Sequence, residues 1–307
     1  MKWQVAVPEP DALGESPFWH PRESRLYWVD IAGRRVRRWD PASGTGEEWS
    51  LPQEAGCIAP AARGGLVLAL RDGIYRARSW GGLLEPVVRF GHAAHSRFND
   101  GKADPLGRLW AGTYYEPKDA RKADLFCIDC RPDNGNGGKA LVQLMATNTM
   151  SSNGLAWSPD QRTLYWADTA DHTVHAWDWG ARGNAMRRHR VFHRFPAKPA
   201  GWQPGQPGYG GRPDGAAVDE EGHYWLAMYE GGRLLRIAPS GAVVAEFEVP
   251  ARCPTMPCFG GPDRRTLYLT SARHGRPPAE LAAFPHSGCV FSARVEVAGL
   301  PVDFFVD

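Results

Sequence analysis

The chain has 307 residues, of which 43% are hydrophobic and 23% charged, and it contains 35 glycines and 26 prolines. A net charge of +2, from 36 basic and 34 acidic residues, gives no general argument for a nucleic-acid partner or an anionic membrane. The composition predicts a turn-rich globular protein, and six irregularly spaced cysteines in a chain of this length do not predict a disulfide scaffold.

The first ten residues, MKWQVAVPEP, lack the apolar segment of a secretory signal peptide. No window of the sequence approaches the ~18 apolar residues that a membrane-spanning helix needs. We therefore expect a cytoplasmic protein without a membrane partner.

Apolar strands of similar character recur along the chain at intervals of roughly 40 to 60 residues. Their centres are Trp28, Leu68, Trp110, Trp166, Leu226 and Leu269. Each unit reads as an apolar strand, a turn such as SPDQR, a strand such as LYWAD and a third strand such as VHAWDW. Such repeats predict an all-β, six-bladed β-propeller that forms a single domain over residues 1–307, with a seven-bladed or irregular ring as the alternative.

The longer intervals contain two predicted loops, one polar (residues 131–139) and one rich in proline and glycine (residues 197–212). The segments WQVAVPEP (3–10) and VEVAGLPVDFFVD (295–307) flank the repeats, so we expect both to complete a shared blade and close the ring. A closed propeller leaves no long sheet edge exposed, which favours a monomer.

Four segments carry an oxygen-bearing side chain at nearly the same offset before an apolar strand. They are Glu15, Asn99, Asn153 and Asp214. Repeats in one register place equivalent residues at equivalent points, so these side chains should converge near the axis of the ring. The set of carboxylates and amides suits Ca²⁺, Mg²⁺ or Mn²⁺, with Zn²⁺ and Fe²⁺ as further candidates, and predicts a central metal site.

The alternative interpretation is that the Asn-Gly and Asp-Gly pairs in these segments are turns. A turn would not require Glu15 at the same place as the other three residues. Cys127 and Cys130 form a CxxC in a predicted strand without two further ligands, so they are interpreted as structural thiols. The sequence contains neither an HExxH nor a GxSxG pattern.

At these residues the chain resembles the SMP-30/gluconolactonase/LRE family, also called regucalcin-like sugar lactonases. The resemblance covers nearly the whole length. It is carried by LGESPFWHPRESRLYWVDI, RFNDGKADPLGRLWAGT, SSNGLAWSPDQRTLYWADT and RPDGAAVDEEGHYWLAM. It implies a six-bladed propeller that binds one divalent cation near its axis and hydrolyses aldonolactones.

By this resemblance Glu15, Asn153 and Asp214 match the metal ligands of the family, and Arg97 and Asn99 match residues that contact the lactone. Glu116 falls where the family has an acidic substrate contact, although the PKDARKAD segment that follows it diverges.

Asp214 is also the candidate general base, because a carboxylate beside an activated water can accept its proton and an amide cannot. We expect metal-dependent hydrolysis of a sugar lactone to the aldonic acid, with Ca, Zn, Mn, Mg or Fe(II) as the single ion. The small-molecule lactone is the expected partner.

Three alternatives remain open at this point. The first is a calcium-binding propeller without catalysis, and the second is a paraoxonase-type hydrolase of hydrophobic lactones. The third is a lactonase for an anionic sugar lactone bearing a uronate or sulfonate group, which would follow if Arg273, His274 and Arg276 faced the pocket. Trp202 and Tyr209 lie either over the pocket or on its rim.

Overall fold

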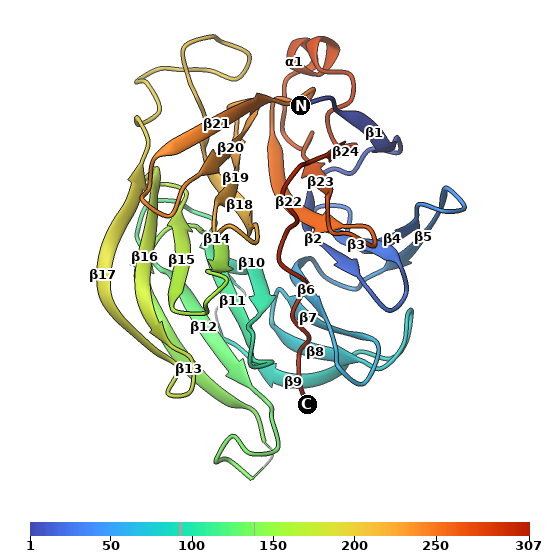
Figure 1. The fold of residues 1–307 in the computed structure, drawn as a ribbon, viewed down its shortest axis with the longest axis vertical. Coiled ribbons are helices and arrows are strands. Elements are labelled where there is room, and N and C mark those ends of the chain that lie inside the picture. The colour runs from blue at the N-terminus through green and yellow to red at the C-terminus, as the bar shows by residue number, and fades with distance from the viewer. Residues whose placement is uncertain (92–93, 138) are drawn as a thin grey trace.

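The structure is a computed structural model that describes residues 1–91, 94–137 and 139–307. In these residues the chain forms six four-stranded antiparallel sheets, which Figure 1 shows arranged as blades around a common centre. The inner strands β2, β6, β10, β14, β18 and β22 each pack beside those of the two neighbouring blades, and β22 packs beside β2. The prediction of an all-β, six-bladed propeller is confirmed.

Five blades take their four strands in chain order, from the axis outward. The first two contain β2 (Gly14–His20), β3 (Arg25–Asp30), β4 (Arg35–Asp40), β5 (Thr45–Ser50), β6 (Ala55–Pro60), β7 (Leu66–Leu70), β8 (Gly73–Ala77) and β9 (Glu85–Arg89). The third and fourth contain β10 (Ser96–Ala103), β11 (Leu109–Tyr115), β12 (Ala123–Asp129), β13 (Leu141–Thr149), β14 (Ser152–Trp157), β15 (Thr163–Asp168), β16 (Thr173–Gly180) and β17 (Ala185–Arg194). The fifth contains β18 (Arg212–Val218), β19 (Tyr224–Tyr229), β20 (Arg233–Ile237) and β21 (Val243–Glu248).

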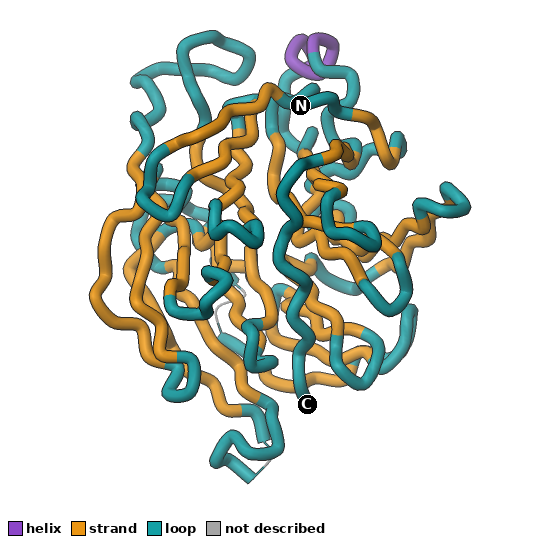
Figure 2. Tube along the Cα trace, viewed as in Figure 1, coloured by secondary structure: helices purple, strands orange, loops and turns teal. Residues whose placement is uncertain are grey.

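The sixth blade combines both parts of the chain, as β22 (Pro254–Gly260), β23 (Thr266–Ser271), β24 (Val290–Arg294) and β1 (Gln4–Val7). The short helix α1 (Pro278–Ala283) lies between β23 and β24 and contrasts with the strands in Figure 2. The prediction that both flanking segments share a blade is confirmed for β1 and wrong for residues 295–307. That segment runs across the blades in Figure 1 and makes bridges to Asp219 and Ala61.

Burial follows the position of a strand within its blade. The six predicted strand centres all lie in the second strand of a blade and are at most 2% exposed. By contrast, the outermost strands β5 and β17 are largely exposed. Apolar side chains between neighbouring blades therefore supply the main stabilisation, at about 25 cal/mol per Å² of buried apolar surface.

A repeated aspartate fixes the hairpin between the first and second strands of a blade. Asp104 accepts hydrogen bonds from two backbone N–H groups of its turn and from Trp110 Nε1, the last at 2.8 Å. Asp219 accepts two such backbone bonds and one from Trp225 Nε1 at 2.9 Å. Because the side chain replaces missing backbone partners, the turn and the buried tryptophan are held in one geometry.

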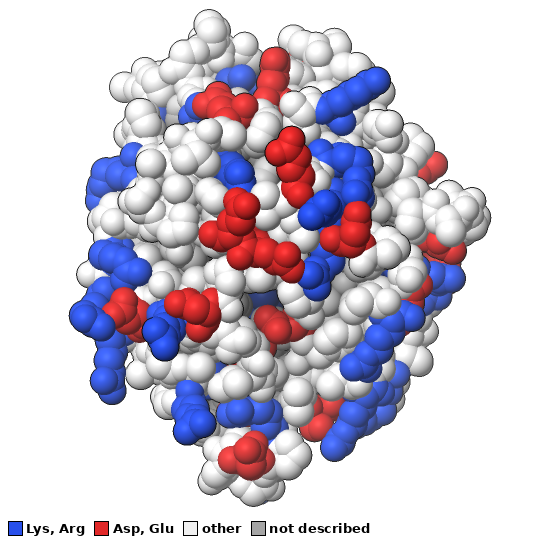
Figure 3. Space-filling view, viewed as in Figure 1, with Lys and Arg blue, Asp and Glu red and all other residues white. Residues whose placement is uncertain are grey.

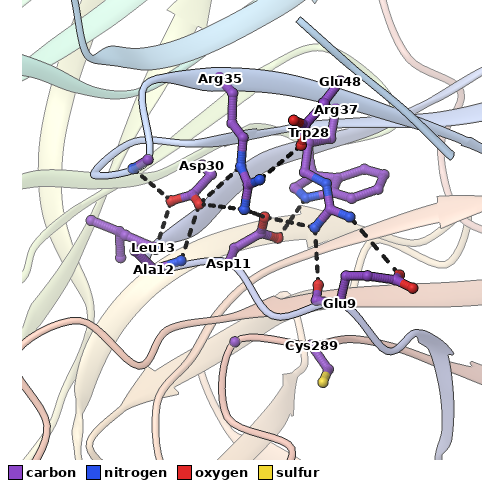
Figure 4. Close-up of polar contacts among 12 residues, drawn as sticks. Glu9, Asp11, Ala12, Leu13, Trp28, Asp30, Arg35, Arg37, Glu48 and Cys289 are labelled. Carbon is purple, nitrogen blue, oxygen red and sulfur yellow. Dashed lines mark hydrogen bonds and ion pairs between the residues drawn. The ribbon is translucent and has the colours of Figure 1, made fainter. Parts of the chain in front are cut away.

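Two buried aspartates hold the segment that leads into the first blade (Figure 4). Asp30 accepts hydrogen bonds from the backbone N–H of Leu13 at 2.9 Å and of Ala12 at 3.1 Å. Asp11 accepts one from Trp28 Nε1 at 2.7 Å and one from Arg37 Nη1 at 2.9 Å. These contacts fix the backbone immediately before β2, the strand that carries Glu15.

The surface carries interspersed acidic and basic side chains on the face shown in Figure 3, as the small net charge suggests. No helix of the described residues has the length and apolar character to cross a membrane. The six cysteines are free thiols, and all but Cys130 are buried.

Candidate active site

Four inner strands have the same irregularity next to a predicted site residue. The pairing of β2 with β3 shifts between Glu15 and Phe18, and that of β14 with β15 shifts between Asn153 and Ala156. The equivalent shifts in β10 and β18 directly follow Phe98 and Pro213. A β-bulge changes the direction of the side chains beside it. The same bulge in four blades therefore gives equivalent positions to Glu15, Asn99, Asn153 and Asp214.

The glycines beside these residues lie in strands, so the turn interpretation of the Asn-Gly and Asp-Gly pairs is wrong. Gly154 has a φ of +62°, and a Cβ there would lie 2.3 Å from Tyr224 Oη. A Cβ on Gly215 would lie 2.4 Å from the Met256 side chain. Glycine is therefore needed because neighbouring inner strands approach closely at the axis.

The inner strands open into a cavity of about 440 Å³ at one end of the axis. All six residues predicted as site residues line it: Glu15, Arg97, Asn99, Glu116, Asn153 and Asp214. Glu15, Asn99, Asn153 and Asp214 are each less than 9% exposed, so their polar groups are held within the fold. The sequence therefore located the cavity, and the roles of these residues are considered below.

A chain of hydrogen bonds orients the two amides. Arg97 Nη1 donates to Asn99 Oδ1 at 2.7 Å, and Asn99 Nδ2 donates to Asn153 Oδ1 at 2.8 Å. Asn153 Nδ2 then donates to Thr169 Oγ1 at 2.7 Å. Each amide has one consistent orientation in this chain, which keeps the Asn153 oxygen on the cavity side of Thr169. Thr169 also lines the cavity, and no sequence pattern indicated this.

Two of the carboxylates that line the cavity, Glu15 and Asp214, are buried without a cationic partner among the described residues. Burial raises the pKa of Glu15 well above its ordinary value, and the nearby charges of Asp214 and Asp100 raise it further. Burial likewise raises the pKa of Asp214, against the opposing charge of Arg212. Neither carboxylate forms an ion pair with any described residue. Two buried carboxylates that repel each other are stabilised by a divalent cation between them.

The donor set fits such an ion. Within the described ranges, no three side chains among His, Cys, Asp and Glu gather as a metal cluster. The set is instead two carboxylates and the Asn153 amide, all oxygen donors, which suits a hard divalent cation and leaves positions for substrate and water.

Asp100 is a third buried carboxylate, which sequence reasoning did not single out. Its Oδ2 accepts a hydrogen bond from the Leu155 backbone N–H at 2.9 Å, and its Oδ1 is buried without a hydrogen-bond partner among the described residues. Burial raises the pKa of Asp100, and the ammonium of Lys102 opposes the rise. Asp100 thereby ties β10 to the backbone that follows Asn153.

Glu116 lines the cavity but is held by an arginine of another blade. Arg71 Nη2 lies 2.7 Å from Glu116 Oε1, and Arg71 Nε lies 2.7 Å from Glu54 Oε2. The guanidinium of Arg71 lowers the pKa of Glu116. The sequence predicted Glu116 through a resemblance and missed Arg71, because nothing in either segment indicates their contact.

The opposite wall contains Arg212, Tyr229 and His274. Of the three basic residues considered after β23, only His274 lines the cavity. Arg273 is exposed, and Arg276 points away from the cavity to Glu280, with Nε 2.7 Å from Glu280 Oε1. The condition that Arg273, His274 and Arg276 face the pocket is therefore met by His274 alone.

The 197–212 segment packs beside the cavity. Trp202 and Tyr209 are absent from its lining and contact each other with ring centroids 5.0 Å apart. Tyr209 Oη is also 2.6 Å from His172 Nε2. Both aromatic residues are less than 9% exposed, so they belong to the rim, and only the end of the segment, at Arg212, reaches the cavity.

Comparisons with known proteins agree with this architecture. Residues 13–273 match the family model described as "SMP-30/Gluconolactonase/LRE-like region". The chain is 43% identical to a 6-deoxy-6-sulfogluconolactonase of Pseudomonas putida, covering 98% of each protein. It is 34% identical to a pentonolactonase of Haloferax volcanii, covering 85% of this chain and 81% of that protein. A crystal structure described as a calcium-binding protein, regucalcin, from Agrobacterium tumefaciens superposes with a TM-score of 0.88 at 26% identity, covering 99% of this chain and 97% of the other.

Proposed function

Because the chain belongs to the SMP-30/gluconolactonase/LRE-like family, we propose that it is a lactonase that hydrolyses a sugar lactone to the corresponding aldonic acid. The observation that carries the proposal is the convergence of Glu15, Asn153 and Asp214 in one cavity with Arg97 and Asn99. The relatives named as lactonases support the reaction class.

The same proposal includes one divalent cation held by Glu15, Asn153 and Asp214. The unpaired burial of the two carboxylates supports it, as does the description of the regucalcin structure as calcium-binding. When bound, such an ion polarises an ester carbonyl and lowers the pKa of water. Ca²⁺, Mg²⁺ and Mn²⁺ match the oxygen donors best, and Zn²⁺ and Fe²⁺ are the other candidates.

Asp214 serves as the general base. Hydrolysis adds water across the ring ester: a base accepts a proton from the attacking water, the C–O bond to the ring oxygen breaks, and the ring oxygen takes up that proton to become a hydroxyl. The Asp214 carboxylate receives no hydrogen bond from the described residues, which leaves its oxygens available for that proton. The Asn153 amide cannot take this part, because it has no basic lone pair at neutral pH.

Arg97 and Asn99 orient the substrate. Among the described residues, Arg97 donates hydrogen bonds through Nη1 alone, to Asn99 Oδ1 and to the Phe98 carbonyl 2.9 Å away. Its Nε and Nη2 donors remain for sugar hydroxyls or the lactone carbonyl. Arg97 is itself fixed by its contact with Asn99. Its free donors can therefore hold the lactone carbonyl beside Asp214, and this positioning lowers the activation barrier for hydrolysis.

The test is hydrolysis of a panel of aldono-1,4- and 1,5-lactones by chelator-treated protein, with each of the five cations restored separately and spontaneous ring opening subtracted. Restoration of turnover by one ion on one lactone supports the proposal and identifies both partners. A flat panel in which the ion still raises the melting temperature favours the alternative, a calcium-binding propeller without catalysis. The single domain over residues 1–307, the cytoplasmic location and the monomeric state stay predictions.

A further inference from the structure

We infer that the substrate carries an anionic group on its sugar, away from the lactone carbonyl, and that the Arg212 guanidinium binds this group. The inference rests on the proposed function and adds the charge of the substrate. Arg212 is the first residue of β18, two positions before Asp214, and it lines the cavity. Its side chain is 29% exposed, and its guanidinium carbon lies 5.1 Å from the centre of the Tyr229 ring, which lines the same wall.

Among the described residues, no carboxylate accepts a hydrogen bond from Arg212, although its charge acts on Asp214. The nearest carboxylate is Glu230, whose Oε2 lies 3.6 Å from Arg212 Nη1 without a hydrogen bond between them. The same Oε2 lies 2.6 Å from Lys198 Nζ, and the other oxygen lies 2.9 Å from Arg276 Nη1. Each oxygen of Glu230 thus lies closer to another cation than to Arg212, and Oε2 accepts no hydrogen bond from the described residues.

The wider cluster still has a surplus of positive charge. Arg276 is shared between Glu230 and Glu280, and within the described part of the chain Lys198 and Arg212 form ion contacts only with Glu230. Three cations therefore surround two carboxylates, and Arg212 makes the longest of their ion contacts. Arg212 is also the member of the cluster that reaches the cavity, so the unbalanced charge is presented there.

Lys198 owes its position to the 197–212 segment. Its ammonium lies 5.0 Å from the centre of the Trp202 ring and 5.3 Å from that of Tyr209. These two rim aromatics hold Lys198 against Glu230, which leaves Arg212 free to face a ligand. The 197–212 segment thus affects the charge of the cavity through Lys198, although Trp202 and Tyr209 do not line the cavity.

The other wall of the cavity is also cationic. Arg97 and Lys118 both line it and lie 5.0 and 5.5 Å from the centre of the Tyr114 ring, and neither forms an ion pair within the part of the chain that the structure describes. The paired carboxylates of Glu54 and Glu116 leave one negative charge after Arg71. With a divalent cation balancing Glu15 and Asp214, the positive charges of the cavity outnumber the negative ones.

A neutral lactone would leave these cations partly desolvated and unmatched, which is unfavourable. A sulfonate, carboxylate or phosphate oxyanion would instead accept charge-assisted hydrogen bonds from the planar guanidinium. Arg212 suits this contact better than Arg97 or Lys118. Arg97 is bound to Asn99 beside the metal ligands, and Lys118 lies on an exposed part of the loop after β11.

The experiment compares metal-loaded wild type with Arg212→Gln on glucono-1,5-lactone and on its 6-deoxy-6-sulfo, 6-phospho and 6-carboxylate counterparts. We expect wild type to prefer one anionic lactone by kcat/KM, and Arg212→Gln to lower that preference roughly 30-fold, mainly through KM, as expected for one lost charge-assisted contact. Comparison of the three anionic lactones shows whether the substrate group that Arg212 binds is a sulfonate, a phosphate or a carboxylate.

Two further variants test the route through Glu230. In Lys198→Gln the Arg212 guanidinium gains access to Glu230, so the preference should fall by a smaller factor, and Lys198→Arg should retain it. Arg252→Gln is the matched control, because Arg252 contacts the same segment 6.0 Å from the Trp202 ring centre but does not line the cavity. It should keep the wild-type preference.

The experiment separates the role of Arg212 in binding an anion from the lactonase activity itself. Turnover without preference for any anion, or an equal loss on neutral and anionic lactones in Arg212→Gln, would overturn the inference and leave the lactonase proposal intact. No turnover of any lactone with any ion would overturn the function. Calorimetric titration with 6-deoxy-6-sulfogluconate, 6-phosphogluconate and glucarate then tests the subsite without turnover, and equal affinities of wild type and Arg212→Gln for all three would refute it.

Discussion

Replacing Thr169 by valine should weaken metal binding although Thr169 is not a proposed ligand. Thr169 Oγ1 accepts the hydrogen bond from Asn153 Nδ2 at 2.7 Å, and both residues are buried. Valine has the same shape and no acceptor, so the Asn153 amide loses one of the two side-chain contacts that fix its orientation. The Asn153 oxygen is then held only by Asn99 Nδ2, at 2.8 Å.

The magnitude follows from this single contact. A buried donor left without its acceptor costs about 1 to 3 kcal/mol. At 1.4 kcal/mol for each factor of ten, the affinity for the activating ion should fall by roughly 5- to 150-fold. The amide can also turn and restore part of its bonding, so we expect the lower half of this range.

The assay is isothermal titration of chelator-treated Thr169→Val with the ion that restores turnover, together with thermal unfolding. Thr113→Val is the matched control, because Thr113 Oγ1 accepts a hydrogen bond from the Asp124 backbone N–H at 2.8 Å and is 2% exposed, yet it does not line the cavity. Both variants should lose stability, and only Thr169→Val should lose metal affinity. Unchanged affinity in Thr169→Val would refute the argument that the hydrogen-bonded chain orients the Asn153 amide.

Three other predictions concern the base, substrate binding and pH. Asp214→Asn should lower kcat about 10²- to 10⁴-fold at saturating metal, measured by initial rates, and near wild-type turnover would exclude Asp214 as the base. Arg97→Ala should mainly raise KM, and a loss confined to kcat would contradict its orienting role. Burial raises the pKa of Asp303 to about 7 in the folded protein, from 3.8 in the unfolded chain. Between these two pH values the folded state binds one more proton than the unfolded state. The contribution of Asp303 to the free energy of unfolding should therefore be complete below about pH 4 and be lost as the pH rises through 7. After allowance for partial exposure, the free energy of unfolding measured with urea should fall by about 2 kcal/mol between pH 4 and 8. The same fall in Asp303→Asn would show that Asp303 is not the group responsible.

The sequence predicted the parts of the structure that depend on repetition. The recurring strands predicted six blades, and the shared offset of Glu15, Asn99, Asn153 and Asp214 predicted that they meet in one cavity. Both predictions succeed because equivalent positions in a repeat acquire equivalent places around an axis. The bulges that direct these side chains have no signal of their own beyond the glycines next to them.

The remaining features depend on contacts between unrelated segments. Arg71 joins Glu116 across blades, and Lys198 competes with Arg212 for Glu230, through loops whose conformation no local pattern specifies. Arg276 was considered for the pocket, but Glu280 of the short helix α1 binds it elsewhere. An ion pair has no period in sequence, so side chains of this kind are located only once the loops are in place.

The pairing of β1 with β24 also affects how the protein is made. The strand β1 is synthesised before its partner β24, while the five blades between them can form in chain order. The sixth blade can therefore close only after residues 290–294 have been made, so β1 has no partner in its own blade while the other five blades are synthesised.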